Sequence, residues 1–278
     1  MRRIIEHLRA RDWSHVLIVL GGIAAIASIW LVSASMLNQP SQYEHNMMMT
    51  RHQAQKPQVT AKPKNADVPM TKPFVADYTI PMASGGVAPV VTRVETQQPI
   101  VFLTIDDGAY KDASVVSLLK ANHIKASLFL AKLFISSNPE FFTQITAQGS
   151  LIENHTLSHD LNMTKDMSYA QQKAEICGMA DYEQQAYGRR PIFYRPPGGA
   201  YTTVMRQAAY DCGMKAVVTW IAKANGGSMQ YQIGDKLRAG DIVLMHFRPE
   251  FKSDLQAFVD AEKAAGLHTE LLEDATIQ

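Results

Sequence analysis

The sequence has few cysteines and no excess of charge of either sign, and both observations exclude some classes of function. Only two of the 278 residues are cysteine, Cys177 and Cys212, too few for a disulfide framework or a four-cysteine metal site. One disulfide bond and two buried thiols are equally compatible with this pair. Lysine and arginine number 27 against 26 aspartate and glutamate, so the composition does not indicate a nucleic-acid partner. The sequence also lacks an internal repeat and a glycine-rich phosphate loop.

The N-terminal region has the features of a membrane segment. Residues 1–15 contain four arginines and precede an uncharged, mostly apolar run over residues 16–37. These 22 residues are enough to cross a hydrocarbon core of about 30 Å as a helix. The preceding arginines favour a cytoplasmic N-terminus, with the rest of the chain outside the cell membrane. A cleaved signal peptide is the alternative, because Val32-Ser33-Ala34 has small residues where a peptidase would cut, but the long apolar run favours an anchor.

Proline marks the segment that follows this run. Eight of the 13 prolines lie between Asn38 and Pro99, among scattered Gln, Lys and Thr with little hydrophobic periodicity. This composition predicts an extended spacer over residues 38–97 and a folded domain over residues 98–278. Residues 90–95 are expected to add a strand just before that domain.

The rest of the sequence alternates strand-like and helix-like segments, which predicts an α/β fold with a parallel sheet or barrel. The first segment, Ile100 to Gly108, is an apolar run rich in β-branched and aromatic residues, typical of a buried strand. The expected helices cover residues 112–122, 139–148, 168–187, 202–212 and 255–265. The further expected strands cover residues 125–130, 150–153, 192–194, 214–220 and 241–246, with a last short strand near His268.

Side chains with acid, base or metal-binding chemistry follow several of these strands. Asp106 and Asp107 end the first strand, and Gly108 lets the chain turn there so that both carboxylates can reach one site. His155 and His159 follow a later strand. At positions i and i+4 their imidazoles would share one face of a helical turn and could meet one metal ion.

Two further strand ends supply an arginine and a third histidine. The segment Tyr194-Arg195-Pro196-Pro197-Gly198-Gly199 is a stiff turn that fixes Arg195 and can aim a backbone N–H inward. The strand beginning at Ile242 ends on His246. Taken singly, each of the four segments has a purely structural explanation. Together they offer three metal ligands with a position open for water, a second carboxylate as a base and a histidine as an acid.

The four ordered motifs resemble those of the polysaccharide deacetylases, carbohydrate esterase family four, over about residues 98–272. Leu103-Thr-Ile-Asp-Asp-Gly108 resembles the family's first motif, His155-Thr-Leu-Ser-His159 the second, Arg195-Pro-Pro-Gly198 the third and Leu244-Met-His246 the fifth. The resemblance implies a distorted (β/α)7 barrel. It also implies metal-dependent hydrolysis of N- or O-acetyl groups of a polysaccharide.

The resemblance further implies a role for individual residues. The backbone N–H of Gly198 would help to hold the oxyanion. The implied catalytic residues are Asp106 as general base, His246 as general acid and Arg195 beside them. The implied ligands of a divalent metal, expected to be Zn2+, are Asp107, His155 and His159. The residues implied to contact substrate are Gly198, Trp220 and Leu244.

The sequence departs from the family at the fourth motif, which carries an aspartate beside a tryptophan and pairs with the arginine of the third motif. Residues 220–227, Trp-Ile-Ala-Lys-Ala-Asn-Gly-Gly, contain no acid. Arg195 is then expected to pair directly with Asp106, or with Asn225. The departure concerns the tuning of the base more than the reaction itself.

The leading hypothesis from the sequence is a membrane-anchored, extracytoplasmic deacetylase that acts on a polymer of N-acetylated sugars, with peptidoglycan as the expected substrate. A non-catalytic glycan-binding module is one alternative, because the fourth-motif acid is missing, although such a module needs neither Asp106 nor His246. A non-haem iron oxygenase is another, because it uses two histidines and one carboxylate. The extra carboxylate and histidine fit hydrolysis better.

Overall fold

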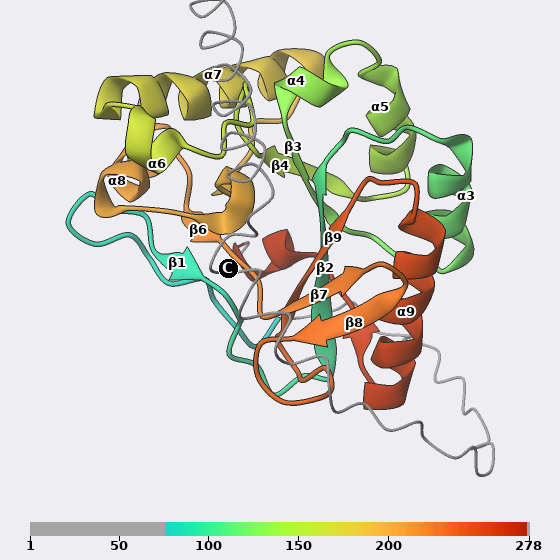
Figure 1. Ribbon diagram of the computed structural model, residues 1–278. Helices are drawn as coiled ribbons and strands as arrows, with labels where there is room; N and C mark the ends of the chain where they lie inside the picture. The colour runs from blue at the N-terminus through green and yellow to red at the C-terminus, as the bar shows by residue number, and fades with distance from the viewer. Residues whose placement is uncertain (1–75, 277–278) are drawn as a thin grey trace, which may run out of the picture. The chain divides into compact units, whose positions relative to one another are not determined.

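Strand β2 (Ile100–Asp107) lies at the centre of the structure, where it pairs with β3 on one side and β9 on the other. The computed structural model describes residues 76–276 (Figure 1). The expected anchor over residues 16–37 and most of the expected spacer lie outside the described residues. Within residues 76–276, no helix has both the length and the apolar character needed to span a membrane.

One sheet contains all the described strands, in the order β1-β6-β5-β4-β3-β2-β9-β7-β8, with β10 beside β2. Every pairing is parallel except that of the β7–β8 hairpin. Because the path ends at β1 and β8, the described sheet is an open α/β half-barrel. The strands besides β2 are β1 (Val90–Val91), β3 (Ser127–Leu130), β4 (Leu151–Asn154), β5 (Phe193–Tyr194), β6 (Ala216–Val218), β7 (Ala222–Asn225), β8 (Ser228–Tyr231), β9 (Ile242–His246) and β10 (His268–Thr269).

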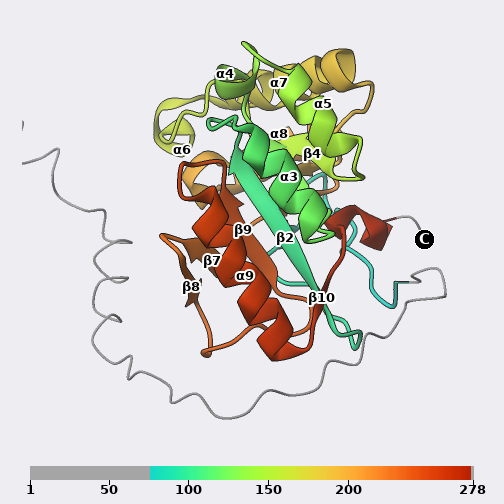
Figure 2. The same ribbon diagram turned by 90° about the vertical axis from the view of Figure 1, so that its right-hand side faces the viewer.

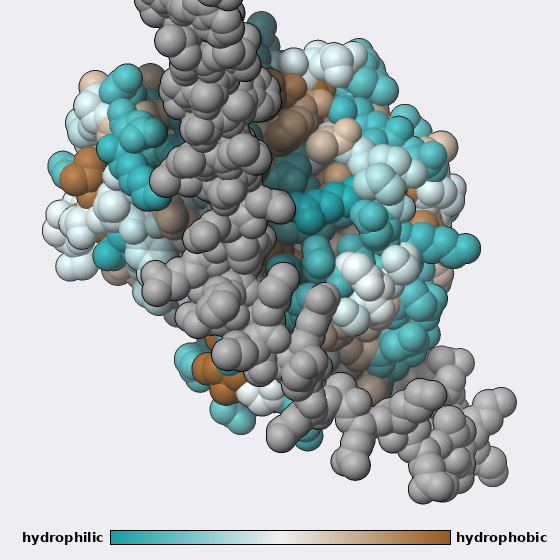
Figure 3. Space-filling view, in the orientation of Figure 1, coloured by the Kyte–Doolittle hydropathy of each residue, from teal (hydrophilic) through white to brown (hydrophobic). Residues whose placement is uncertain are grey.

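Helices cover the outer face of the sheet. Figure 2 shows α3 and α9 side by side in front of β2 and β9. The surface over α3 and α9 is mostly hydrophilic in Figure 3, as expected for helices that bury only one face. The helices are α3 (Ala113–Ala121), α4 (Lys132–Ile135), α5 (Glu140–Thr146), α6 (Met163–Asp166), α7 (Tyr169–Tyr187), α8 (Thr203–Asp211) and α9 (Phe251–Ala265), with 3-10 turns η2 (Pro197–Gly199) and η3 (Leu272–Thr276).

A disulfide bond joins two of these helices. Cys177 of α7 is bonded to Cys212, the residue that caps the C-terminus of α8. The cysteine count left a disulfide bond and two buried thiols equally open, and the structure has the disulfide bond.

The alternation of side chains along β2 divides the core into two layers. Leu103 and Ile105 pack in the cluster that includes residues of α3, α5 and α9. Phe102 points to the other face and packs in a cluster with Phe129 of β3 and Phe193 of β5. Side chains two and four positions after Phe102 are therefore expected on this inner face of the sheet.

The segment before β2 belongs to the folded unit, which corrects the expected spacer boundary at residue 97. Tyr78, Val91 and Val94 are buried in the inner cluster. Strand β1 pairs with β6, and Arg93 forms an ion pair with Asp241 at an Nε–Oδ1 distance of 3.2 Å. The folded unit thus includes residues 76–97, because their apolar side chains pack in the core and their backbone pairs with the sheet.

Candidate active site

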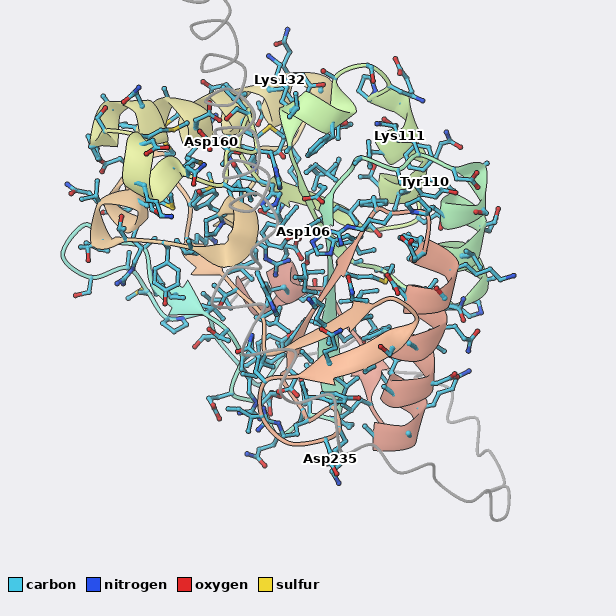
Figure 4. All side chains as sticks on the ribbon, in the orientation of Figure 1. Asp106, Tyr110, Lys111, Lys132, Asp160 and Asp235 are labelled. Carbon is cyan, nitrogen blue, oxygen red and sulfur yellow. A yellow bond between two sulfur atoms is a disulfide. The ribbon has the colours of Figure 1, made fainter. Side chains whose placement is uncertain are left out.

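The C-terminal ends of β2, β4, β5 and β9 lie at one end of the sheet and bring the expected site residues together. Figure 4 shows Asp106 near the middle of the ribbon, with Tyr110 and Lys111 on one side and Asp160 on the other. Asp235, by contrast, lies at the far end of the molecule in this view. Parallel strands present their chemistry at this edge in many α/β enzymes.

A backbone reversal at Asp107 brings the two adjacent carboxylates to the same site. The φ angle of Asp107 is 75°, a left-handed conformation that is uncommon for a residue with a side chain. Gly108 follows with a φ of 83°, and a Cβ there would lie 2.6 Å from Cγ2 of Ile135. The sequence indicated a turn at Gly108; the structure shows that the turn begins one residue earlier.

The histidine pair lies in a loop, which corrects the expected helical turn. Thr156 and His159 both have left-handed backbones, with φ angles of 76° and 54°. The Thr156 hydroxyl oxygen accepts a hydrogen bond from the His159 N–H at 3.0 Å. As a result, Nε2 of His159 lies 3.0 Å from Oδ1 of Asp107, and Nε2 of His155 lies 3.4 Å from the same oxygen.

The arrangement of these three side chains fits a divalent metal ion. One ligand atom from each of Asp107, His155 and His159 lies within 4.8 Å of the others. Nδ1 of His155 is hydrogen-bonded at 2.7 Å to the backbone carbonyl oxygen of Arg195, which leaves Nε2 as the nitrogen available for a metal. Two imidazoles and one carboxylate form the ligand set of many catalytic zinc sites, with room for a further ligand.

The electrostatics of the site favour a cation beside Asp107. Burial raises the pKa of the Asp107 carboxyl, but hydrogen bonds with His155 and His159 outweigh it and hold the pKa well below its usual range. Burial lowers the pKa of His155, yet the charges of Asp106 and Asp107 outweigh that effect and raise it. The two carboxylates therefore stabilise positive charge at this position.

Arg195 and Asp106 form a buried ion pair. Nη1 of Arg195 lies 2.6 Å from Oδ1 of Asp106, and the arginine side chain is 0% exposed. The guanidinium lies over the Phe129 ring at 4.2 Å and the Trp220 ring at 5.6 Å from their centroids. Arg195 thus pairs with Asp106, the first of its two expected partners, and not with Asn225.

The second oxygen of Asp106 faces His155. Oδ2 lies 3.8 Å from Nε2 of His155, while Oδ1 is occupied by Arg195. A carboxylate held by one oxygen in this way can use the other to accept a proton from a water molecule at the site.

His246 ends β9 directly beside Asp106 of β2 in the register of the sheet. Burial lowers the pKa of His246 to about 4, although the charges of Asp106 and Asp107 partly oppose the shift. Among the described residues, its Nδ1 atom is buried and has no hydrogen-bond partner. A protonated His246 would therefore give up its proton readily.

Of the residues expected to contact substrate, Trp220 lies near Arg195 and Leu244 is the register partner of Thr104. Gly198 has a φ of 67°, and a Cβ there would lie 3.3 Å from Cδ2 of Leu161. A Cβ on Gly199 would lie 2.7 Å from the Trp220 ring, so glycine allows the indole to approach the backbone. Leu244 is buried within β9, two residues before His246.

Comparison with known proteins shows what part of the chain is similar to. Residues 93–217 match the family model for polysaccharide deacetylase. The matched part of the chain is similar to the polysaccharide deacetylases. It contains the first three of the four motifs, so the resemblance to that family is confirmed there.

The individual relatives match only part of this chain, and the first of them is matched over less than two thirds of its own length. An uncharacterized protein of Streptomyces coelicolor is 38% identical over 157 residues, which is 56% of this chain and 62% of that protein. A peptidoglycan-N-acetylglucosamine deacetylase of Bacillus cereus is 26% identical over 166 residues, 56% of this chain and 76% of that protein. A family 4 carbohydrate esterase pseudoenzyme of Bacillus anthracis shares the fold, with a TM-score of 0.58 and 20% identity over 67% of this chain and 68% of that one.

Sequence reasoning missed three side chains at the candidate site, namely Thr104, Phe129 and Leu161. Thr104 accepts a hydrogen bond from Arg195, and its position two residues before Asp106 on a strand was a usable signal. Phe129 and Leu161 reach the site from β3 and from the loop after His159. Nothing local in the sequence marks these two residues, because their place depends on the packing of distant segments.

Proposed function

We propose that this chain is a metal-dependent deacetylase that hydrolyses N-acetyl groups of an extracytoplasmic glycan, with peptidoglycan or another N-acetylglucosamine polymer as substrate. One observation supports it above all: a carboxylate fixed by a buried arginine, Asp106, lies beside the three-residue ligand set of Asp107, His155 and His159. A metal site alone would also serve a binding protein, but a base beside it serves hydrolysis.

Each side chain has its own role in the proposed amide hydrolysis. A divalent cation held by Asp107, His155 and His159, which we propose to be Zn2+, would polarise the acetyl carbonyl and lower the pKa of a water molecule. Oδ2 of Asp106 takes the proton of that water as it attacks the carbonyl carbon. Arg195 holds Oδ1 and keeps the carboxylate in place.

His246 and Gly198 act on the leaving group and on the developing negative charge. His246 gives a proton to the amine nitrogen as the carbon–nitrogen bond breaks, and acetate is the second product. The backbone N–H of Gly198 donates a hydrogen bond to the carbonyl oxygen while it carries negative charge. Trp220 and Leu244 supply apolar surface near the acetyl group.

A glycan-binding module without catalytic activity is the second candidate. Two observations favour it: the segment Trp220 to Gly227 contains no acid, and one protein that shares this fold is described as a pseudoenzyme. Such a module would bind the same glycans but release no acetate.

Acetate release by the full chain tests the choice between these functions. Peptidoglycan, chitin oligomers and acetylxylan are incubated with protein that has been stripped of metal by a chelator, with and without added Zn2+. We expect metal-dependent acetate release from an N-acetylated polymer. Binding of a glycan without acetate release under any condition supports the module instead, and turnover that requires O2 supports the oxygenase.

We further propose that residues 16–37 anchor the protein in the cell membrane with the deacetylase domain outside. The arginines of residues 1–15 and the 22-residue uncharged run support this orientation. Protease added to intact cells is expected to remove the domain. A protected domain contradicts the proposal, and a secreted protein that begins near Ser35 supports a cleaved signal peptide.

A further inference from the structure

Thr104 lies beneath the catalytic carboxylate on the inner face of β2. It precedes Asp106 by two residues, so both side chains project from the same face of the strand. The Thr104 side chain is completely buried. Its hydroxyl makes two hydrogen bonds, at 2.7 Å with the backbone carbonyl oxygen of Val243 and at 2.8 Å with Nη1 of Arg195.

The direction of both hydrogen bonds is fixed. A hydroxyl has one hydrogen, and the Val243 carbonyl can only accept it, so the Thr104 oxygen is left as an acceptor for the Arg195 N–H. The β-branched threonine side chain has little freedom about χ1, which holds this acceptor in place.

The two hydrogens of Nη1 are therefore shared between two acceptors. One goes to Thr104 at 2.8 Å and the other to Oδ1 of Asp106 at 2.6 Å. The remaining guanidinium contacts are to backbone carbonyl oxygens, from Nε to Val218 at 3.1 Å and from Nη2 to Thr219 at 3.2 Å. Arginine thus contacts only one oxygen of the carboxylate.

An isolated pair of an arginine and a carboxylate usually prefers a different geometry. Arginine and a carboxylate frequently form two parallel N–H···O bonds, which occupy both carboxylate oxygens. Without the Thr104 acceptor, the guanidinium would gain by rotating toward Asp106 to satisfy the released N–H. That rotation would engage Oδ2, the oxygen that faces His155 at 3.8 Å.

We propose that Thr104 is a positioning residue, whose hydroxyl restrains Arg195 to a single contact with Asp106 and so keeps Oδ2 available at the site. Its effect on turnover rests on the proposed deacetylase function, whereas its effect on the geometry of Arg195 does not. The same hydroxyl takes part of the role of the acid that the segment after Trp220 lacks, because it satisfies a guanidinium N–H with a neutral group.

Three variants of the full chain test this inference. Thr104→Val keeps the shape of the side chain and removes the hydroxyl, while Thr104→Ser keeps the hydroxyl. Ser127→Ala is the matched control: Ser127 is the register partner of Thr104 on β3 and is also buried, but its hydroxyl bonds Oε2 of Glu273 at 2.7 Å and not Arg195.

Steady-state acetate release separates positioning from a general loss of stability. We expect Thr104→Val to lower kcat by about 10- to 100-fold with KM changed less than about twofold, since a misplaced base costs turnover more than binding. Thr104→Ser is expected to recover kcat to within about threefold of the parent. Ser127→Ala should lose thermal stability but keep the parent's kcat. A Thr104→Val variant with the parent's kcat, or an equal loss in Ser127→Ala, overturns the inference.

Crystal structures of Thr104→Val and Thr104→Ser give a readout that does not depend on activity. The expected result is that the Arg195 guanidinium contacts both oxygens of Asp106 in the valine variant and only Oδ1 in the serine variant. An unchanged single contact in Thr104→Val overturns the inference. If the parent releases no acetate, the proposed function fails, and these two structures alone decide the role of Thr104.

Discussion

The backbone carbonyl oxygen of Arg195 accepts a hydrogen bond from Nδ1 of His155 at 2.7 Å. Arg195 therefore supports both halves of the site. Its main chain orients one of the two histidines of the proposed metal site, and its side chain forms the buried ion pair with Asp106. The two contributions are separable, because a side-chain substitution leaves the carbonyl in place.

Replacing Arg195 with methionine should lower stability more than metal affinity. Loss of the guanidinium leaves the Asp106 carboxylate buried without its partner, which typically costs about 3 to 5 kcal/mol. The carbonyl that orients His155 remains, so the metal dissociation constant should change less than about tenfold. Urea denaturation and calorimetric metal titration measure the two quantities.

The double variant Arg195→Met with Asp106→Asn is the control for this experiment. It removes both charges, so much of the lost stability should return. If Arg195→Met stays folded yet no longer binds metal, the carbonyl does not orient His155 as described.

Much of the fold follows from the sequence where local chemistry and packing agree. The expected helix over residues 168–187 matches α7, because Ser168 and Gln171 form a capping box at its start and Gly188 ends it with a φ of 73°. Strand β2 was recognisable because a buried central strand is apolar almost throughout. The parallel α/β class followed from the alternation of such segments.

Other parts of the structure depend on contacts that the sequence does not show. The loop of His155 and His159 requires a left-handed Thr156, whose N–H bonds the side chain of Asn154 at 3.0 Å. The β7–β8 hairpin was missed, although Gly226 and Gly227 between its strands are a turn signal. Helix α9 begins at Phe251, four residues before the expected start at Leu255, because Phe251 packs in the core.

Truncation tests the boundary of the folded unit. A chain that begins at residue 76 should fold, whereas one that begins at residue 96 should lose more than about 5 kcal/mol of unfolding free energy. The second truncation removes the buried side chains of Tyr78, Ile80, Val91 and Val94, each worth about 1.5 to 3 kcal/mol when fully buried. Circular dichroism with thermal denaturation measures both. Equal stability of the two chains would place the boundary near residue 98 after all.

Glu183 of α7 should make the domain less stable as the pH rises. It is buried, and among the described residues neither carboxyl oxygen has a hydrogen-bond partner. Burial first, and the charge of Glu153 second, raise its pKa well above the usual range. A raised pKa in the folded state contributes stability at low pH, and that contribution is lost as the pH rises above the ordinary glutamate pKa.

Replacing Glu183 with methionine is therefore expected to stabilise the domain by about 1 to 3 kcal/mol at pH 8, and by less at pH 4.5. Urea denaturation at the two pH values measures the difference. Asp181→Asn is the control, since Asp181 lies on the same helix with its side chain 69% exposed. If the stability gained by Glu183→Met does not depend on pH, ionisation of the Glu183 carboxyl is not the cause of that gain.

The central claim is that the two adjacent carboxylates have different roles, Asp107 as a metal ligand and Asp106 as the general base. Asp107 lies 3.0 Å from Nε2 of His159 and supplies the only anionic ligand of the proposed three-residue set, so Asp107→Asn should weaken metal binding. Asp106→Asn keeps that set, but the amide cannot accept a proton from water. Calorimetric titration of both variants with Zn2+ establishes the metal occupancy needed for the comparison of rates.

Acetate release from an N-acetylglucosamine polymer, by the parent and by Asp106→Asn at equal metal occupancy, tests this claim most directly. We predict that the variant binds metal as the parent does and releases acetate about 10²- to 10⁴-fold more slowly, the usual cost of a lost general base. Equal rates for the two proteins would contradict the account.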